Sequence, residues 1–252
     1  MSDSTLVESM QRFYDAVARR SPELAFLNYG FVDDPEAPPS DVDLLAMSRR
    51  LYEVVLLPFP EGARRAVEVG CGRGGGAKFL LDGRPGLGYL GLDLSAEHVA
   101  LSRSRISPRH ATHFAMADAA FLPVATASAD VLFSIEAAQH FERPERFYLE
   151  AARVIRPGGW FLLAALWPPS SLPDAFFATC GLRIVERRDI TANVVCSLDR
   201  TSDLRQEMVE SLDLPERFRP LLLSWAGVRG TPSYDNLATG AMRYVSYRLQ
   251  RE

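Results

Sequence analysis

The sequence predicts an α/β fold, an open sheet with helices between its strands. Three observations predict it. Short apolar runs at 66–69, 89–94 and 130–135 have the length of buried strands, helical runs follow the first two, and the first run ends in a glycine-rich turn. Open α/β sheets bind their ligands at the carboxyl ends of the strands, so we expect a ligand at that turn. A chain of 252 residues with 47% hydrophobic content can bury a substantial core as a single domain.

Two helices are expected before the first strand. Residues 1–20 form an amphipathic helix, with apolar side chains recurring on one face. Residues 32–43 are rich in proline and aspartate and predict a loop. Residues 44–57 predict a second helix, which ends at Pro58. Together they make residues 1–60 a largely helical N-terminal segment.

The glycine-rich turn predicts a nucleoside site. Residues 66–76 read Ala-Val-Glu-Val-Gly-Cys-Gly-Arg-Gly-Gly-Gly, and glycines let a ligand lie against the backbone. Gly70, Gly72 and Gly75 also satisfy the dinucleotide fingerprint, in which a pyrophosphate lies at the helix N-terminus. S-adenosylmethionine has no phosphate, and its ammonium or ribose hydroxyls require an acid. Glu68 stands two residues before the turn and would repel a pyrophosphate, so it favours S-adenosylmethionine.

Acids also follow the next two strands. Residues 89–95 form a strand that ends in Asp93, the usual position of an acceptor for ribose hydroxyls with either cofactor. Ser95 is the better N-cap for the next helix, which leaves Asp93 for a ligand. A third strand at 113–116 leads to Asp118. That carboxylate could accept a hydrogen bond from the adenine amine.

The middle of the chain decides between the two cofactors. Residues 130–136 form a buried strand, 144–155 a helix, and 156–159 the turn Arg-Pro-Gly-Gly before a strand at 160–166. This order, with the glycine turn after the first strand, resembles the class I S-adenosylmethionine-dependent methyltransferases.

The resemblance covers residues 64–166, which it identifies as the cofactor-binding core. It implies a Rossmann-like seven-stranded sheet whose last strand is antiparallel. It also implies S-adenosylmethionine as the cofactor. The residues that it places around the cofactor are Glu68, Gly70, Gly72, Asp93, Leu94, Asp118, Ala119 and Glu136.

The C-terminal part predicts two more strands and an insertion. The strands are expected at 182–189 and 242–249, with a helical stretch at 202–224 between them. This class of fold usually builds its substrate cap before the final strand. We therefore expect residues 197–232 to form such a cap.

A closer resemblance extends over nearly the whole chain. The segments at 26–35, 74–76, 136–137, 189–194 and 227–231 are similar to phthiotriol dimycocerosate methyltransferases and related O-methyltransferases of lipids and polyketides. Those enzymes methylate hydroxyl groups on large apolar molecules, which implies an apolar small molecule as the partner. The resemblance also makes residues 1–60 a lid over the cofactor, with contacts from Tyr14, Asn28 and Tyr29.

Composition excludes other classes of protein. Because there is no apolar run of about 18 residues and no basic-then-apolar leader, we expect neither a membrane span nor a secretory signal. The three cysteines lack metal-ligand spacing and suit a reduced cytoplasm. A net charge of −4 and a pI near 5.7 argue against a nucleic-acid partner. No metal is expected, since the histidines and acids lack ligand spacing.

The predicted reaction needs a base if the acceptor is a hydroxyl. Histidine, with a pKa near 6.5, suits that task. Of the four histidines, His140 follows the fourth strand, in the loop that faces the transferred methyl in this fold. The phthiotriol enzymes carry their histidine one place earlier, where this chain has Gln139, so a structural histidine remains the alternative. Asp189 is expected as an auxiliary carboxylate.

The remaining histidines are expected to be structural: His98, His110 and His113. The sequence therefore predicts an S-adenosylmethionine-dependent O-methyltransferase acting on an apolar hydroxylated molecule. Two alternatives remain. One is carboxyl methylation of a fatty or polyketide acid, which needs no base because the carboxylate is already ionised. The other is a cyclase that holds the cofactor without transferring its methyl group.

Overall fold

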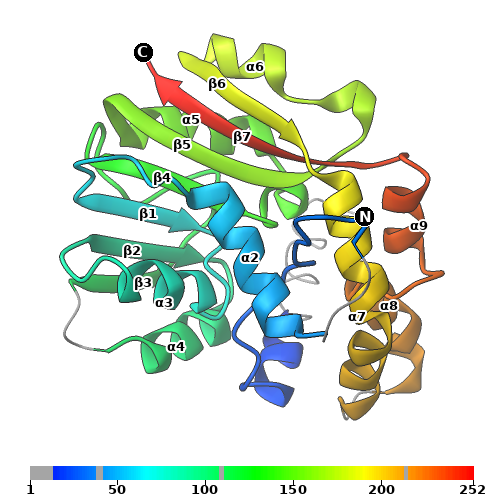
Figure 1. Ribbon diagram of the computed structural model, residues 1–252. Coiled ribbons are helices and arrows are strands. Elements are labelled where there is room, and N and C mark those ends of the chain that lie inside the picture. The colour runs from blue at the N-terminus through cyan, green and yellow to red at the C-terminus, as the bar shows by residue number, and fades with distance from the viewer. Residues whose placement is uncertain (1–13, 38–41, 108–110, 213–214) are drawn as a thin grey trace.

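A seven-stranded sheet forms the centre of the computed structural model, which describes residues 14–37, 42–107, 111–212 and 215–252 (Figure 1). The strand order is β3-β2-β1-β4-β5-β7-β6. β7 pairs antiparallel with β5 and β6, and the other pairs are parallel. The strands are β1 (Arg65–Val69), β2 (Gly88–Asp93), β3 (Thr112–Met116), β4 (Ala129–Ile135), β5 (Ile155–Trp167), β6 (Leu182–Asp189) and β7 (Arg243–Arg251). The predicted α/β fold and its antiparallel last strand are confirmed.

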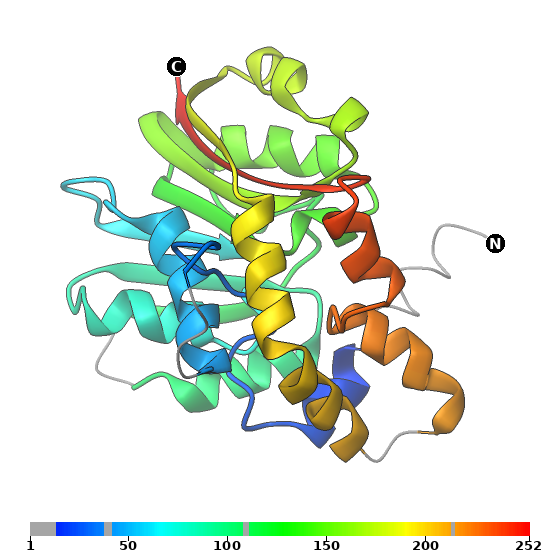
Figure 2. The same ribbon diagram turned by 45° about the vertical axis from the view of Figure 1, so that its right-hand side comes forward.

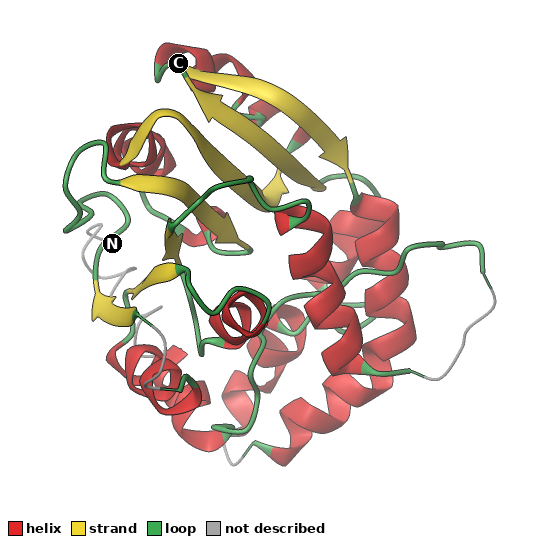
Figure 3. Cartoon of the chain, turned by 60° about the vertical axis from the view of Figure 1, so that its left-hand side comes forward, coloured by secondary structure: helices red, strands yellow, loops and turns green. Residues whose placement is uncertain are grey.

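Helices lie on both faces of the sheet (Figure 1, Figure 3). They are α2 (Leu44–Leu56), α3 (Gly75–Asp82), α4 (Ala96–Arg105), α5 (Pro144–Val154), α6 (Asp174–Thr179), α7 (Thr191–Ser211), α8 (Arg219–Trp225) and α9 (Pro232–Ala238). Short 3₁₀ turns are η1 (Ala138–His140), η2 (Pro169–Ser171) and η3 (Glu216–Phe218). Among the described residues, no helix has both the length and the apolar character to cross a membrane.

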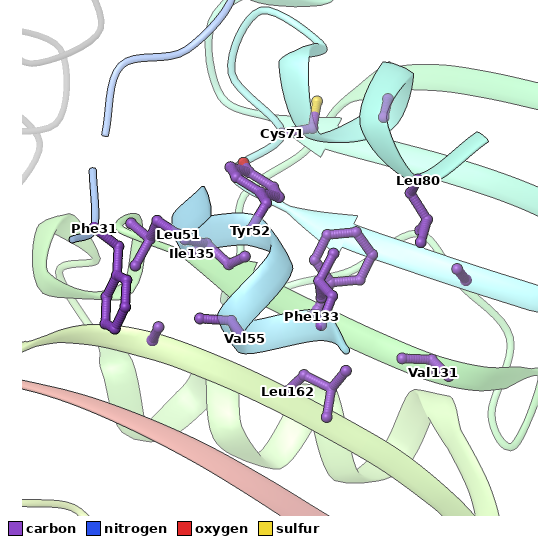
Figure 4. Packing of buried hydrophobic residues seen from close by; sticks show 14 of the residues in the cluster. Phe31, Leu51, Tyr52, Val55, Cys71, Leu80, Val131, Phe133, Ile135 and Leu162 are labelled. Carbon is purple, nitrogen blue, oxygen red and sulfur yellow. The ribbon is translucent and has the colours of Figure 1, made fainter. Parts of the chain in front are cut away.

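Alternation along β4 divides the core into two clusters. Val131, Phe133 and Ile135 face the cluster that includes side chains of α2, α3 and α7. Leu132 lies in the other cluster, which is covered by α5 and α6. All residues of β4 are buried, as expected for a central parallel strand with helices on both sides. Figure 4 shows the packing of the first cluster, where Phe133 lies near side chains of α2.

The C-terminal insertion is helical, as expected for 202–224, and its helices have other bounds. The structure has α7, which begins at Thr191, followed by η3 and α8. Pro215 stands directly before η3, and Pro220 lies in the first turn of α8. A proline is tolerated in a first turn, but in a helix interior it removes a hydrogen bond and clashes with the preceding turn, so one continuous helix is not possible here. α9 was not expected from the sequence. The Arg-Pro-Gly-Gly segment, expected as a turn before the strand, lies within β5.

A third, smaller cluster joins the N-terminal segment to this insertion. Residues 14–20 are helical, and residues 1–13 of the expected first helix lie outside the described part. The helix packs beside α7 and α8 (Figure 2). The buried members of the cluster are Val17, Val209, Leu212, Leu222, Ala226 and Val228. Two segments far apart in the chain therefore share one apolar contact.

Candidate active site

A cavity of about 580 Å³ lies at the carboxyl ends of β1, β2 and β4. The glycine turn and the loops after β2, β3 and β4 form one side of it. Tyr14, residues 25–29 and Trp225 of α8 contribute the other side. The expected ligand position at this edge of the sheet thus coincides with a cavity between the sheet, residues 14–29 and the insertion.

The glycine turn is held open by its backbone. Gly70 and Gly72 have φ of +77° and +53°, which L side chains rarely adopt. The amide groups of Gly70 and Cys71 donate to the carbonyl oxygen of Leu92 at 2.8 and 3.0 Å, which fixes the turn to β2. A Cβ built on Gly72 would meet nothing within 4 Å. The backbone at Gly72 therefore leaves space for a ligand.

Asp93 is fixed at the end of β2. Its Oδ2 accepts from the amide of Gly72 at 2.8 Å, and its Oδ1 accepts from the amide of Ser95 at 3.0 Å. As expected, the Ser95 hydroxyl caps α4 by accepting from the amide of His98 at 3.1 Å. Asp93 lines the cavity and is oriented by backbone donors on two sides, an arrangement suited to a ribose.

His98, expected to be structural, lies in this site. Its Nδ1 is 3.2 Å from Oδ1 of Asp93 and donates to it, because a carboxylate oxygen can only accept. The ring is 3% exposed, lines the cavity and packs edge-on against Tyr14, with centroids 5.5 Å apart. Its spacing of five residues from Asp93, on the first turn of a capped helix, is the signal that could have identified it.

Glu68, expected to receive the cofactor, does not line the cavity. It is completely buried on the other side of the glycine turn. The Tyr52 hydroxyl donates to Oε1 at 2.9 Å, and the Tyr89 hydroxyl donates to Oε2. Burial raises the pKa of the Glu68 carboxyl to about 8, while the two hydroxyl donors act in the opposite direction. Glu68 is therefore a core residue next to the glycine turn, bonded to two tyrosine hydroxyls, and does not face the cavity.

This burial predicts a pH-dependent stability. Glu68 has a folded-state pKa of about 8, well above the unfolded value near 4.3. The proton that the folded state binds at Glu68 therefore adds to the free energy of unfolding, and this contribution is complete below the unfolded pKa. The contribution is lost as the pH rises toward the folded pKa, at about 1 kcal/mol per pH unit. Glu68→Gln, which stays neutral, should therefore gain relative stability between pH 5 and 8, as measured by urea unfolding. Parallel pH curves for the two proteins would contradict this assignment.

The loop after β3 supplies the remaining wall near β2. Leu94, Asp118 and Ala119 line the cavity, as the family resemblance implied. Oδ1 of Asp118 accepts from the amide of Ala120 at 2.8 Å, so the side chain forms a turn as well as facing the site. The Asp118 carboxylate and an adjacent backbone amide therefore lie together, an arrangement suited to the hydrogen-bonding edge of a purine base.

Glu136 connects β4 to the N-terminal segment. Its φ is +53°, an unusual value for a residue other than glycine, and its carboxylate accepts from the amide of Tyr29 at 2.9 and 3.0 Å. Burial raises the pKa of Glu136 to about 7. Asn28 lines the cavity, but its side chain binds the backbone of Ser48 and Gly30. It shapes the segment that carries Tyr29.

His140 lies in η1, directly after this loop. It lines the cavity as an exposed residue, and partial desolvation by the surrounding protein lowers its pKa. Tyr14 packs edge-on against the ring, with centroids 6.1 Å apart. Gln139 lines the cavity too, and its Nε2 donates to the carbonyl oxygen of Glu136 at 3.0 Å. His140 is therefore the cavity histidine with a lowered pKa.

Asp189 is not brought into the site. It ends β6, away from the residues that line the cavity. Its Oδ1 accepts from the amide and hydroxyl of Thr191 at 3.0 and 2.5 Å, and Oδ2 lies 3.6 Å from Nη1 of Arg243. The carboxylate starts α7 rather than orienting a base. Within the described ranges, no group of histidine, cysteine and acidic residues could hold a metal ion.

Three comparisons bear on this site. Residues 67–163 match the family model of a methyltransferase domain. The chain is 31% identical to a phthiotriol/phenolphthiotriol dimycocerosates methyltransferase of Mycobacterium tuberculosis, over 100% of this chain and 95% of that protein. It is 29% identical to a fatty-acid O-methyltransferase of Mycolicibacterium smegmatis, over 90% of this chain and 84% of that protein.

Among solved structures, the fold is similar to that of the [4+2]-cyclase SpnF, with a TM-score of 0.73 and 20% identity. That likeness covers 96% of this chain and 94% of the cyclase. The domain match, the full-length relative and the position of the cavity all indicate the same family. The chain belongs to the S-adenosylmethionine-dependent methyltransferases and uses S-adenosylmethionine as its cofactor.

Proposed function

We propose that the chain methylates a hydroxyl group of an apolar small molecule, such as a lipid or a polyketide. The observation that carries this proposal is His140, a histidine of lowered pKa in the wall of a cavity that also contains Tyr14 and Trp225. A neutral imidazole can take the proton of a hydroxyl, and aromatic walls suit an apolar acceptor. The names of the two relatives, a phthiotriol/phenolphthiotriol dimycocerosates methyltransferase and a fatty-acid O-methyltransferase, support the substrate class.

The side chain of Gln139 lies beside the ring of His140. Its Nε2 is 3.4 Å from Nε2 of His140 and also donates to the carbonyl oxygen of Glu136. Whether the ring nitrogen of His140 donates or accepts in this contact depends on the tautomer of the ring. A general base needs a ring nitrogen whose lone pair is free to take the proton of the hydroxyl, so the proposal requires that nitrogen to face the acceptor.

The residues present fit the cofactor. S-adenosylmethionine supplies an already activated methyl group, so the chain has to bind, align and exclude water. We assign Asp93 to the ribose hydroxyls, Asp118 to the adenine amine, and the backbone at Gly70 and Gly72 to close contact with the ligand. Glu136 stands at the opposite side of the turn, next to the lid residue Tyr29.

Three parts of the chain would share this work. Residues 64–166 would bind the cofactor, residues 1–60 would form a lid, and residues 197–232 would cap the acceptor. Trp225 of the cap and Tyr14 of the lid both line the cavity, with ring centroids 6.3 Å apart. This contact supports closure of both segments over a single site.

The lid proposal predicts a change in hydrogen exchange. The described part of the lid is held by side chains of the core: Nη1 of Arg73 donates to the Ser21 carbonyl at 2.6 Å, and Nη2 of Arg105 to that of Leu24 at 3.0 Å. Residues 14–31 should exchange more slowly with S-adenosylhomocysteine than in the free protein, since a bound ligand adds contacts to this segment. Identical exchange with and without ligand would reduce the segment to surface packing.

Carboxyl methylation is the second candidate. Arg143 lines the cavity and could pair with the carboxylate of a fatty acid, and a relative carries the name fatty-acid O-methyltransferase. A cyclase without methyl transfer is the third, because the similar fold of SpnF belongs to a cyclase.

One assay separates these functions. The protein is incubated with methyl-labelled S-adenosylmethionine and matched long-chain alcohols and fatty acids, and products are extracted. Hydroxyl methylation predicts S-adenosylhomocysteine formed in step with a labelled ether. Labelled products from the fatty acids alone would favour carboxyl methylation. Conversion of an added polyketide without S-adenosylhomocysteine would overturn both.

A further inference from the structure

Arg205 is a buried cation in the middle of α7. Its residue is 4% exposed, although arginine is seldom buried without partners. Nε donates to the Thr201 hydroxyl at 2.7 Å, and Nη1 donates to the carbonyl oxygen of Ala226, after α8, at 3.1 Å. Nη2 donates to the carbonyl oxygens of Asn28 and Tyr29 at 3.3 and 3.0 Å. One guanidinium thus joins α7, the end of α8 and the N-terminal segment.

Arg205 holds the Tyr29 peptide opposite Glu136. The Tyr29 amide donates to both carboxylate oxygens of Glu136, while its carbonyl oxygen accepts from Arg205 and from the Ser197 hydroxyl at 2.8 Å. The Tyr29 ring lies 5.9 Å from the guanidinium carbon and lines the cavity. The peptide is therefore fixed from both sides, by the loop after β4 and by α7.

The same arginine contributes to the charge balance of Glu136, which is partly buried. The described side chains that interact electrostatically with Glu136 are Tyr14, Tyr29, Tyr52, Tyr244 and Arg205. Burial raises the pKa of Glu136, and the Tyr29 amide, the Tyr244 hydroxyl and the charge of Arg205 act against it, in that order. Arg205 is the cation in this group, and its own pKa, lowered by burial to about 10, leaves it charged at neutral pH. Removing it would leave a partly buried carboxylate without its counter-charge.

We propose that Arg205 is a positioning residue of the cofactor site: it holds the Tyr29 peptide against the Glu136 carboxylate, so that residues 25–29, which line the cavity, are kept over S-adenosylmethionine. Arg205 lies outside the residues that line the cavity and acts through Tyr29 and Glu136. The proposal concerns binding of the cofactor and does not depend on the acceptor.

The test is calorimetric titration with S-adenosylhomocysteine between pH 6 and 9. In the wild-type protein, binding should strengthen as the pH rises through about 7, the pKa of Glu136, because the ionised carboxylate accepts the Tyr29 amide. Arg205→Met should weaken binding by about tenfold or more and move this midpoint to higher pH. Arg205→Lys keeps the charge and should keep the midpoint, with affinity between the other two.

Arg183→Met is the matched control. Arg183 is exposed on β6, outside the lid, the cap and the residues that line the cavity, and its Nη2 donates to Oε1 of Gln250. It should match the wild-type affinity and midpoint. Wild-type affinity and midpoint in Arg205→Met would overturn the proposal. If that variant does not fold, Arg205→Lys decides: reduced affinity with an unchanged midpoint supports the proposal, and wild-type affinity contradicts it.

Discussion

Asp93→Ala should weaken binding of S-adenosylmethionine by about 1 to 3 kcal/mol, roughly fivefold to 150-fold. The substitution removes a charged acceptor for the ribose. It also removes the acceptor of the Gly72 and Ser95 amides and of Nδ1 of His98, so the turn itself loses support. Because these losses occur in one small network, the effect should lie in the upper part of the range.

Calorimetry with a matched control measures this effect. Asp82→Ala removes an exposed acid at the end of α3, whose partner is Lys78, and should leave the dissociation constant unchanged. An Asp93→Ala variant that folds and binds with wild-type affinity would show that the ribose lies elsewhere. NADH should not bind to either protein. Micromolar binding of NADH would revive the dinucleotide alternative.

His140→Ala should lower turnover of a hydroxyl substrate by about 100-fold or more. The cavity then lacks the group that takes the hydroxyl proton, while Asp93 and the glycine turn are unchanged. Affinity for S-adenosylhomocysteine should therefore stay within a few-fold of wild type. In the wild-type enzyme, kcat/KM should rise with pH through a pKa below 6.5, since desolvation lowers the pKa of His140 and the neutral ring is the active form.

His113→Ala is the control for this experiment. His113 is exposed on β3 and does not line the cavity, so its removal should not change turnover. Wild-type turnover in His140→Ala would show that this residue only aligns the site or that the acceptor is already ionised. If His140→Ala keeps its activity toward a fatty acid and loses its activity toward an alcohol, His140 is needed to methylate a hydroxyl. Methylation of a carboxylate would then need only binding and alignment of the substrate.

Local patterns were enough to predict most of the fold. The apolar runs became β1, β2 and β4, and the glycine turn and Asp93 occupy the expected edge of the sheet. These features depend on neighbours in the sequence: strand length, glycine conformation and the acid at a strand end. The antiparallel last strand came from the family resemblance.

Side-chain direction was less predictable. Glu68 lies between Val67 and Val69, whose side chains belong to the cluster under α5. Successive residues of a strand point to opposite faces, so Glu68 points to the face that carries Tyr52 of α2. Proximity to the turn suggested a ligand contact, whereas the alternation of the strand places the carboxylate in the core.

Residues that act through distant contacts were missed altogether. Arg205 binds carbonyl groups of residues 28 and 29, more than 170 positions away in the sequence, as the separations of 177 and 176 show. No local spacing indicates such a contact. His98 differs, because it follows Asp93 by five residues: Asp93 ends β2, and His98 lies in the first turn of α4. A capped helix after an acid is thus a usable signal for a residue that orients the acid.

The position of the transferred methyl group tests the central proposal most directly. Product made with methyl-labelled S-adenosylmethionine is treated with alkali, which hydrolyses a methyl ester to labelled methanol and leaves a methyl ether intact. Hydroxyl methylation predicts that the label survives alkali and is released by hydriodic acid. Release of the label by alkali would show a carboxyl acceptor, and a label resistant to both treatments would show methylation at carbon; either result would contradict hydroxyl methylation with His140 as the base.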